Sequence, residues 1–454
     1  MNKSIITGTK EIELIRDSYL NKLLQQCEQQ SLVKDDSIGN LLRQLRQQAT
    51  YQVLESRLPT QKDEEWRFTD LSPLIEINFQ LGEKSNMERN IHSNALEQFI
   101  IPEAKESRLV LINGIYTPEW SDVSGMCDNV YVGNITELSA PQKEKIEQYL
   151  GTIEERNSSG AEPCPLTALN TAGLNDVAVI WVNSNAVVEK PIHILHLSVG
   201  EETPYFSQPR TLVIGETSSS LELIEEYGTI GNNCAYLTNG VTEIWVQENA
   251  SVKHTRIQRE SEAGFHLGKS AIAQARDSRY TCTEVNLGAK LSRHNLEIYQ
   301  RGEQTETYLN GLTVVGGEQL ADTHSAVLLS KPHGTVNQLH KCIVDDSART
   351  VFNGRVFVPK AAQQTDAAQL NRNLLLSPKA RVNTKPELQI TADDVKCSHG
   401  ATISQLEADE VFYLRSRGLN ERDACVLLID AFASEILQRI PVPSLSEKLA
   451  RCID

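Results

Sequence analysis

Two kinds of hydrophobic pattern divide the chain. Near the start, six apolar residues recur at three- and four-residue steps, as on one face of an amphipathic helix: Ile38, Leu41, Leu42, Leu45, Ala49 and Val53. Pro59 then ends the helix. In the KDEEWRFTDL segment that follows, Trp66 and Phe68 are expected to anchor this helical part onto the next one. The alternative for these two rings is stacking on a ligand.

From about residue 166 the pattern changes to short alternating or β-branched runs, which is typical of strands. Examples are VAVIWV from 177, SLELIEEY from 220, TEIWVQ from 242 and TYLNGLTVV from 307. Turn-forming residues separate the later runs at intervals of 11 to 19 residues: Asp277, Gly288, Gly302, Gly316, Pro332, Asp345, Pro359, Pro378 and Asp393. This spacing predicts a sandwich, a barrel or a β-solenoid, and a solenoid suits the length best because stacked coils extend one core.

Helical sequence returns near the C-terminus. The segment DEVFYLRSRG ends at Gly418, and Asn420 is placed to cap a second helix. Its expected apolar stripe consists of Ala424, Leu427, Leu428, Ala431, Phe432 and Ile436. We therefore expect an N-terminal helical domain (1–80), a mixed connecting region (81–165), a β-solenoid core (166–403) and a C-terminal helical domain (404–454). The open ends of the solenoid need covering by helices or a partner.

Charge and cysteine content limit the possible partners and the cellular compartment. The chain carries 60 acidic and 44 basic residues, a net charge of -16, which disfavours nucleic acid and anionic membranes as partners. The N-terminal residues lack the features of a secretory or transit peptide, and no apolar run has the roughly 20 residues that span a bilayer. Nine cysteines without a CxxC pair indicate a reducing compartment, so we expect a cytoplasmic protein.

A phosphate-binding loop is not expected. GFHLGKS at 264–270 resembles one, but Ala263 stands where the loop needs its first glycine, and a strand pattern surrounds it. We interpret Lys269 and Ser270 as strand residues and expect no nucleotide on this chain.

The segment DVKCSHGATI carries the most chemistry. On a strand, Cys397 and His399 share one face, and a thiolate beside an imidazole suits iron, copper or zinc. The structural alternative is a buried cysteine and a hydrogen-bonded histidine. His340 and Cys342 have the same spacing, and the two pairs together would make a four-ligand zinc site if they met. Neither a third orienting group beside Cys397 nor a recognisable carboxylate pair is present, so we expect no catalytic site.

Residues 337–418 resemble the core of the SufB/SufD family of iron–sulfur cluster assembly proteins. The likeness is carried by NQLHKCIVDDSARTVFNG, QTDAAQLNRNLLLSPKARVNTKPELQI, ADDVKCSHGAT and FYLRSRGL, and more weakly by PLTALNTAGLNDVAVI and KDEEWRFTDL. The CSHGAT form looks like the SufD branch, since SufB-type chains tend to carry a CEHEAT-like segment there. The resemblance implies a mainly β fold, a right-handed parallel β-helix flanked by N-terminal and C-terminal helical domains.

The resemblance also implies a scaffold rather than an enzyme. A SufB-like chain and a SufC-like ABC-type ATPase would be its partners, with a homodimer left open when the SufB-like chain is absent. His399, with Cys397 beside it, would lie at the SufB–SufD interface, where a transient iron–sulfur cluster forms. The ATPase would dock on the C-terminal helices, for which we expect these contact residues: Arg415, Arg417, Leu419, Asn420, Leu427 and Phe432.

Two alternatives belong to other classes. One is a cytosolic β-solenoid enzyme acting on carbohydrate, against which the cysteine content and the missing secretory signal argue. The other is a purely structural assembly module without metal contact.

Overall fold

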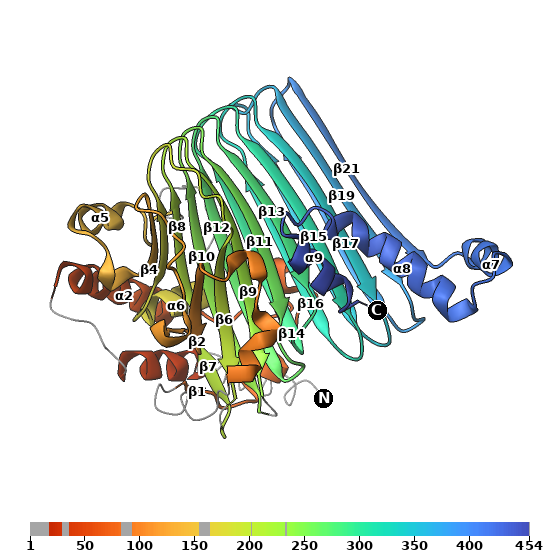
Figure 1. The fold of residues 1–454 in the computed structure, drawn as a ribbon, viewed down its shortest axis with the longest axis horizontal. Coiled ribbons are helices and arrows are strands. Elements are labelled where there is room, and N and C mark those ends of the chain that lie inside the picture. Colours follow the sequence, from red (N-terminus) through yellow and green to blue (C-terminus); the bar gives the residue numbers. More distant parts are fainter. Residues whose placement is uncertain are drawn as a thin grey trace, which may run out of the picture.

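The fold is a long β-solenoid with helices at both ends (Figure 1). The computed structural model describes residues 18–29, 36–82, 93–153, 164–200, 202–231 and 234–453. In that part of the chain the helices are residues 18–29, α2 (Ser37–Glu55), α3 (Ser72–Ile75), α5 (Ala140–Lys145), α6 (Pro165–Ala172), α7 (Ala408–Ser416), α8 (Glu421–Leu437) and α9 (Pro443–Ala450). The 3₁₀ turns are η1 (Glu64–Trp66), η2 (Ser93–Phe99), η3 (Pro102–Ala104), η4 (Pro118–Trp120), η5 (Ile135–Glu137) and η6 (Ile146–Gln148).

The described strands form two sheets. Sheet A contains β1 (Gln80–Leu81), β4 (Val130–Asn134), β5 (Ala178–Val182), β7 (Tyr205–Ser207), β8 (Arg210–Gly215), β10 (Tyr236–Val246), β12 (Gly264–Gln274), β14 (Leu291–Gln300), β16 (Leu320–Leu328), β18 (Arg349–Val358) and β20 (Arg381–Ile390). Sheet B contains β2 (Arg108–Ile112), β3 (Ile115–Tyr116), β6 (Ile192–Val199), β9 (Ser220–Ile230), β11 (Ser251–Arg259), β13 (Arg279–Asn286), β15 (Glu306–Val315), β17 (Thr335–Val344), β19 (Thr365–Leu375) and β21 (Val395–Gln405).

The chain alternates between the sheets from β8 onward, so that each strand pairs in parallel with the strand two further along. This is a β-solenoid of about eight turns, as expected from the sequence. All nine predicted turn residues fall between strands, and Asp277 adopts a left-handed φ of 56°, a conformation that aspartate tolerates better than most residues. The strands β2, β3 and β4, from residues 81–165, also belong to these sheets.

The solenoid interior has an apolar part and a polar part. The apolar part runs along the coils from Leu109 to Ala392, with side chains from both sheets in one cluster. The polar part contains buried carboxylates paired with histidines from neighbouring coils. Glu225 contacts His254 at 3.2 Å, and Glu284 contacts His294 at 2.7 Å. Such pairs are costly to bury unless each charge finds a partner.

A buried arginine supplies part of that compensation. Arg256 Nη1 lies 3.1 Å from Glu284, and both side chains are almost inaccessible. Burial alone would raise the pKa of Glu284, but His294 and the charge of Arg256 outweigh it and hold this pKa below its usual range. Burial lowers the pKa of His294 and of His340 to about 4, so both are neutral at pH 7.

The low pKa values of these two histidines predict that acid destabilises the fold. As the pH falls below about 6.5, the unfolded chain binds protons at His294 and His340, whereas the folded chain does not until about pH 4. Protons bound only by the unfolded state lower the free energy of unfolding across that window. We expect the thermal midpoint to fall by at least about 5 °C between pH 7 and pH 4.5, measured by calorimetry.

Two histidine variants check the assignment. His340→Gln removes one buried titrating ring and should flatten the decline between pH 6.5 and 4. His399→Gln makes the same substitution at an exposed ring and is the matched control. Equal slopes in all three proteins would contradict the role of the buried histidines.

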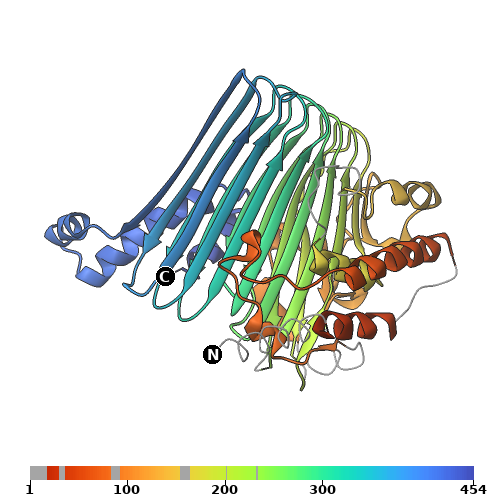
Figure 2. The same ribbon diagram turned by 180° about the vertical axis from the view of Figure 1, so that it is seen from behind.

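The N-terminal segment crosses the outer face of sheet A (Figure 2). The helix predicted from Ile38 to Val53 lies within α2, where the Asp36 side chain accepts a hydrogen bond from the Gly39 amide. Trp66 is buried and stacks beneath the Arg293 guanidinium, 3.8 Å from the ring centre. This ring anchors the segment as predicted. The prediction for Phe68 was wrong, because its side chain is 43% exposed.

The second half of α8 and the helix α9 pack on the outer face of sheet B. Ile436 and Leu437 of α8 and Leu445 of α9 join a buried cluster with strand residues such as Leu312 and Ile343. The first half of α8 and all of α7 extend beyond the solenoid (Figure 1). Among the described helices, none has both the length and the apolar character needed to cross a bilayer.

Candidate functional site at the open end of the solenoid

The last coil leaves two strand edges uncovered among the described residues. β20 pairs with β18 and β21 pairs with β19, and each is the end strand of its sheet. Most residues of β21 are exposed, whereas the inward-facing residues of β19 are buried. An edge strand offers its backbone N–H and C=O groups to a further strand. In the described structure this end is therefore open to pairing with a further strand.

Cys397 and His399 lie on this edge strand. They align with Ala367 and Gln369 of β19, whose buried side chains line the solenoid interior. Cys397 and His399 consequently share the inward-pointing face, as their spacing predicts. Cys397 is partly covered and packs against the apolar core, while His399 is exposed. Burial raises the pKa of the Cys397 thiol, so a thiolate there needs a cation beside it.

The second pair, His340 and Cys342, lies apart from the first. Both residues are on β17 and are buried, and β19 separates this strand from β21. Two strand spacings amount to about 10 Å, so the two pairs do not converge on one ion. His340 Nε2 contacts the Thr313 hydroxyl at 3.1 Å, and its ring stacks on Phe352. The described residues contain no group of three or more histidine, cysteine or carboxylate side chains arranged to hold a metal.

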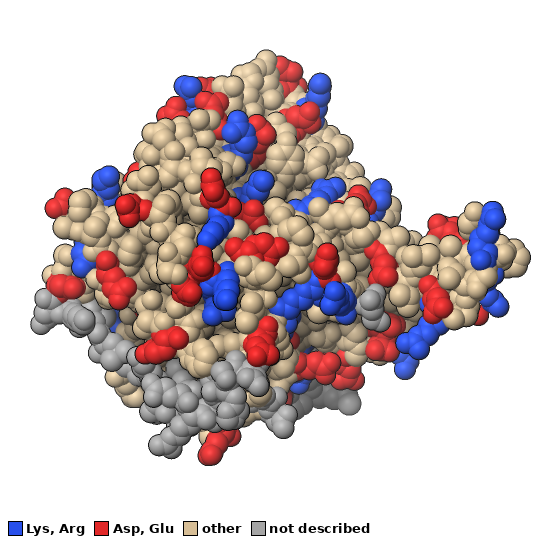
Figure 3. Space-filling view, in the orientation of Figure 1, with Lys and Arg blue, Asp and Glu red and all other residues tan. Residues whose placement is uncertain are grey.

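A helical arm, consisting of α7 and the first half of α8, adjoins the open end. Gly418 adopts a φ of 102°, and the Asn420 side chain caps α8 by accepting from the Asp423 amide, so both helix boundaries fall where predicted. Phe412 and Tyr413 are 71% and 57% exposed. Figure 3 shows the arm as a lobe separate from the body, with charged side chains around it. Adjacent exposed apolar side chains of this size are a common feature of interaction surfaces.

The predicted contact residues divide between the arm and the body. Arg415 pairs with Glu421 at 3.3 Å, and Arg417 lies over the Tyr413 ring. Asn420 is exposed, Leu419 is partly buried, and Leu427 is 48% exposed. Phe432 instead packs towards sheet B beneath the Lys341 ammonium. The predicted stripe is thus only partly packed: Leu427 and Ala431 are exposed, and the buried face of α8 consists of Ala424, Ala433, Ile436 and Leu437.

The segment that imitates a phosphate loop is an interior strand. Residues 264–270 lie in β12, as predicted, and the buried Lys269 ammonium contacts Glu297 at 3.0 Å. Its charge is therefore already engaged by a neighbouring carboxylate.

Sequence reasoning missed the aromatic pair of the arm and the buried carboxylate–histidine pairs. The exposure of Phe412 and Tyr413 could have been predicted from the sequence. The helix α7 is too short to bury both rings together with an apolar stripe. The carboxylate–histidine pairs could not have been predicted. Glu284 and His294 come from different sheets, so no sequence spacing relates them.

Comparison with known proteins agrees with the resemblance seen in the sequence. A family model described as the SufBD core domain of the SUF system for iron–sulfur cluster assembly matches residues 197–432, and one for the SufBD N-terminal region matches residues 16–194. An iron–sulfur cluster assembly SufBD family protein of Synechocystis is 52% identical over 87% of both chains. SufD of Escherichia coli is 30% identical over 88% of this chain and 89% of its own length.

One relative is a plant protein whose name states a compartment. A protein of Arabidopsis thaliana named chloroplastic is 38% identical over 86% of this chain and 80% of its own length. The compartment of the present chain therefore stays a prediction. Since the two family models together cover most of the residues, the chain belongs to the SufBD family of iron–sulfur cluster assembly proteins.

Proposed function

We propose that this chain is a non-catalytic, SufD-type scaffold subunit that pairs with a SufB-like chain through the open end of the solenoid. One observation carries the proposal: Cys397 and His399 point inward from an edge strand whose outer side pairs with no other described strand. A strand contributed by the partner would complete the sheet and bring its own side chains beside these two. Without that partner, a second copy of this chain would have the same edge to pair with.

The nascent iron–sulfur cluster is the cargo of this shared site. A cluster is held by several thiolate or imidazole ligands, and this strand offers two. The remaining ligands would come from the partner. Incomplete ligation by each chain suits a scaffold, because separation of the two halves releases the product. The high pKa of the free Cys397 thiol fits a ligand that ionises only when iron is present.

Docking of a SufC-like ATPase is assigned to the helical arm. Its exposed aromatic rings and the charged groups of Arg415 and Arg417 form a projecting surface beside the open end. Such aromatic and arginine residues contribute strongly to protein interfaces. ATP would bind to that partner, since Lys269, in the segment most like a phosphate loop, is buried in a strand.

Replacement of His399 tests the shared site. The His399→Ala chain, coexpressed with its SufB-like and ATPase partners and purified anaerobically, should form the same complex with an unchanged thermal midpoint. Loss of one ligand should lower the affinity for the cluster by at least about tenfold. Bound iron and acid-labile sulfide should fall together. Cys397→Ser should reduce them comparably if both side chains bind the cluster, and less if His399 alone does.

Ser398→Ala is the matched control, because Ser398 is exposed on the opposite face of the same strand. It should retain the parental iron and sulfide content. A stable His399→Ala complex with parental iron and sulfide would contradict the role of His399 and leave the chain as a structural partner only.

A further inference from the structure

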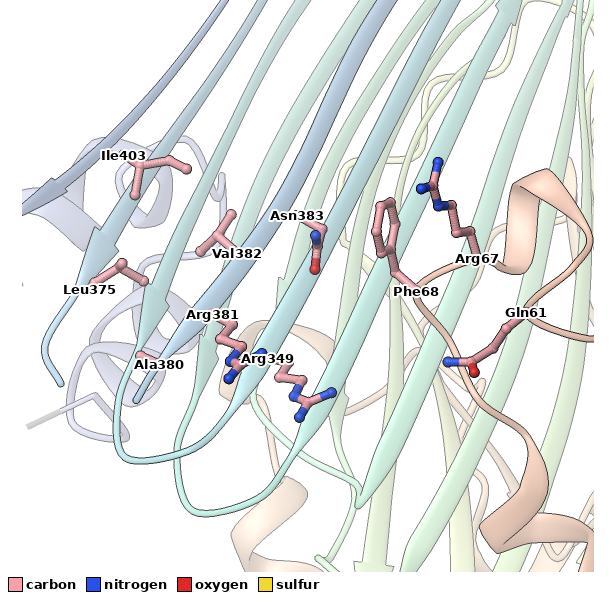
Figure 4. Close-up of a pocket in the computed structure, with 10 residues that line it drawn as sticks. All are labelled: Gln61, Arg67, Phe68, Arg349, Leu375, Ala380, Arg381, Val382, Asn383 and Ile403. Carbon is pink, nitrogen blue, oxygen red and sulfur yellow. The ribbon is translucent and has the colours of Figure 1, made fainter. Parts of the chain in front are cut away.

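A basic pocket lies on the rim of the open end. It encloses about 540 Å³ and is lined by three arginines, Arg67 from the N-terminal segment, Arg349 from β18 and Arg381 from β20 (Figure 4). The exposed Phe68 ring stands in the same wall. The family resemblance assigns no role to these residues, and Phe68 is the residue whose predicted anchoring proved wrong.

The three guanidinium groups have no anionic partner among the described residues. No carboxylate of the described residues forms an ion pair with Arg67, Arg349 or Arg381, although the chain as a whole is strongly acidic. Arg349 and Arg381 are also direct neighbours in the register of β18 and β20. Like charges opposite each other on adjacent strands destabilise a sheet. This arrangement therefore costs the free chain stability unless an anion is bound.

Neighbouring cations on the same face are paired differently. Lys385 contacts Glu64 at 2.6 Å and Glu387 at 3.2 Å, and Arg355 contacts Glu65. The N-terminal segment thus supplies carboxylates to the cations further along β18 and β20. At the rim it supplies Arg67 instead. An anion bound at this rim would therefore come from outside the described chain.

The position of the pocket indicates where such an anion would come from. The lining also includes Val382 and Asn383 of β20 and Ile403 of β21, and Ile403 is 52% exposed. The pocket is therefore continuous with the strand edges at which the SufB-like chain is proposed to pair. We propose that it receives an acidic segment of that partner, with carboxylates bound by Arg349 and Arg381. The inference rests on the proposed pairing and adds the chemistry of recognition to it.

Guanidinium groups suit this task because they bind carboxylates through two parallel hydrogen bonds. An acidic segment would also neutralise the repulsion between Arg349 and Arg381. A neutral or basic segment would leave this repulsion uncompensated, so the arginine pair selects for an acidic one. The apolar side chains of Phe68 and Ile403 provide surface for the non-charged part of the segment.

The test compares two charge-reversed chains of equal net charge. Arg349→Glu combined with Arg381→Glu should weaken binding to the SufB-like chain by at least about tenfold at low salt. Lys143→Glu combined with Lys145→Glu makes the same change in α5, at the opposite end of the solenoid, and should leave the affinity within about twofold of the parent. Affinities are measured by titration calorimetry at several salt concentrations.

A neutral variant separates recognition from folding. Arg349→Gln combined with Arg381→Gln removes the like-charge pair, so the free chain should melt at the parental temperature or above while binding the partner more weakly. A merely structural role for the arginines predicts the reverse, a lower midpoint with unchanged affinity, and that result would overturn the proposal.

The remaining outcomes also decide the question. Parental affinity in the glutamate variant, or equal losses in both charge-reversed chains, would refute the pocket and leave the pairing intact. A parent chain that does not bind the SufB-like chain at all would refute both. Tight binding of inorganic pyrophosphate to the free parent, lost in the glutamate variant while partner affinity is unchanged, would assign the pocket to a small oxyanion instead.

Discussion

Aspartate at positions 412 and 413 is expected to abolish co-purification of the ATPase. The two rings are the most exposed aromatic side chains of the helical arm, and interface aromatics of this kind each contribute about 2–4 kcal/mol to binding. Replacing both with charged residues should weaken the complex at least about 100-fold. The thermal midpoint of the free chain should not change, because neither side chain packs against the solenoid.

Tyr51→Asp combined with Leu54→Asp is the matched control. These residues are 60% and 56% exposed on α2, so the variant places the same charges at similarly exposed apolar positions far from the arm. It should bind the ATPase like the parent. Undiminished binding by the arm variant would refute docking at α7. Deleting the whole C-terminal segment is a poorer test, since it would uncover the apolar cluster around Leu312 and Ile343.

Glu284→Ala is expected to cause the largest loss of stability of any single change proposed for this chain. It leaves Arg256, which is 1% exposed, without its carboxylate, and His294 without its acceptor. Breaking one side of a buried ion pair costs about 3–5 kcal/mol. In a domain of this size the thermal midpoint should fall by roughly 10 °C. Chemical denaturation at pH 7 gives the free energy directly.

The comparison is Glu306→Ala, which removes the same side chain from the exposed pair with Arg279. That pair is half in solvent, so its loss should cost at most about 1 kcal/mol. A double variant, Arg256→Met with Glu284→Leu, should recover much of the stability lost in Glu284→Ala, because it leaves no unpaired charge behind. Equal losses of stability for Glu284→Ala and Glu306→Ala would show that the buried ion pair contributes no more to stability than the exposed one.

Features encoded within a few residues could be predicted from the sequence. The turn at Asp277, the cap at Asn420 and the helix end at Gly418 each depend on the conformational preference of one residue, and each occurs where expected. Strand periodicity likewise placed Cys397 and His399 on one face. Local preferences of this kind act before the chain is folded, so they can be seen without the rest of the molecule.

Features that depend on the stacking of coils could not be predicted. Arg349 and Arg381 are 32 residues apart in the chain, and only the length of the intervening coil brings them into register. The helical stripe that contains Leu427 has the correct period, but only part of α8 lies over sheet B, so Leu427 and Ala431 stay exposed. Trp66 and Phe68 are two residues apart, and the docking of their segment buries one ring and exposes the other.

Because the coils stack at a constant spacing, the distance between two strands of one sheet is a multiple of that spacing. The packed half of α8 rests on β15 and β17, and the edge strand β21 lies two strands beyond β17. The packed half of α8, which anchors the arm, and the edge that carries Cys397 and His399 are therefore separated by a whole number of strand spacings, each about 4.8 Å. Insertion or loss of a complete coil between them would change that separation by one strand spacing while keeping every remaining strand in register. Intermediate separations are not accessible, so the geometry between an ATPase on the arm and a cluster at the edge can change only in steps.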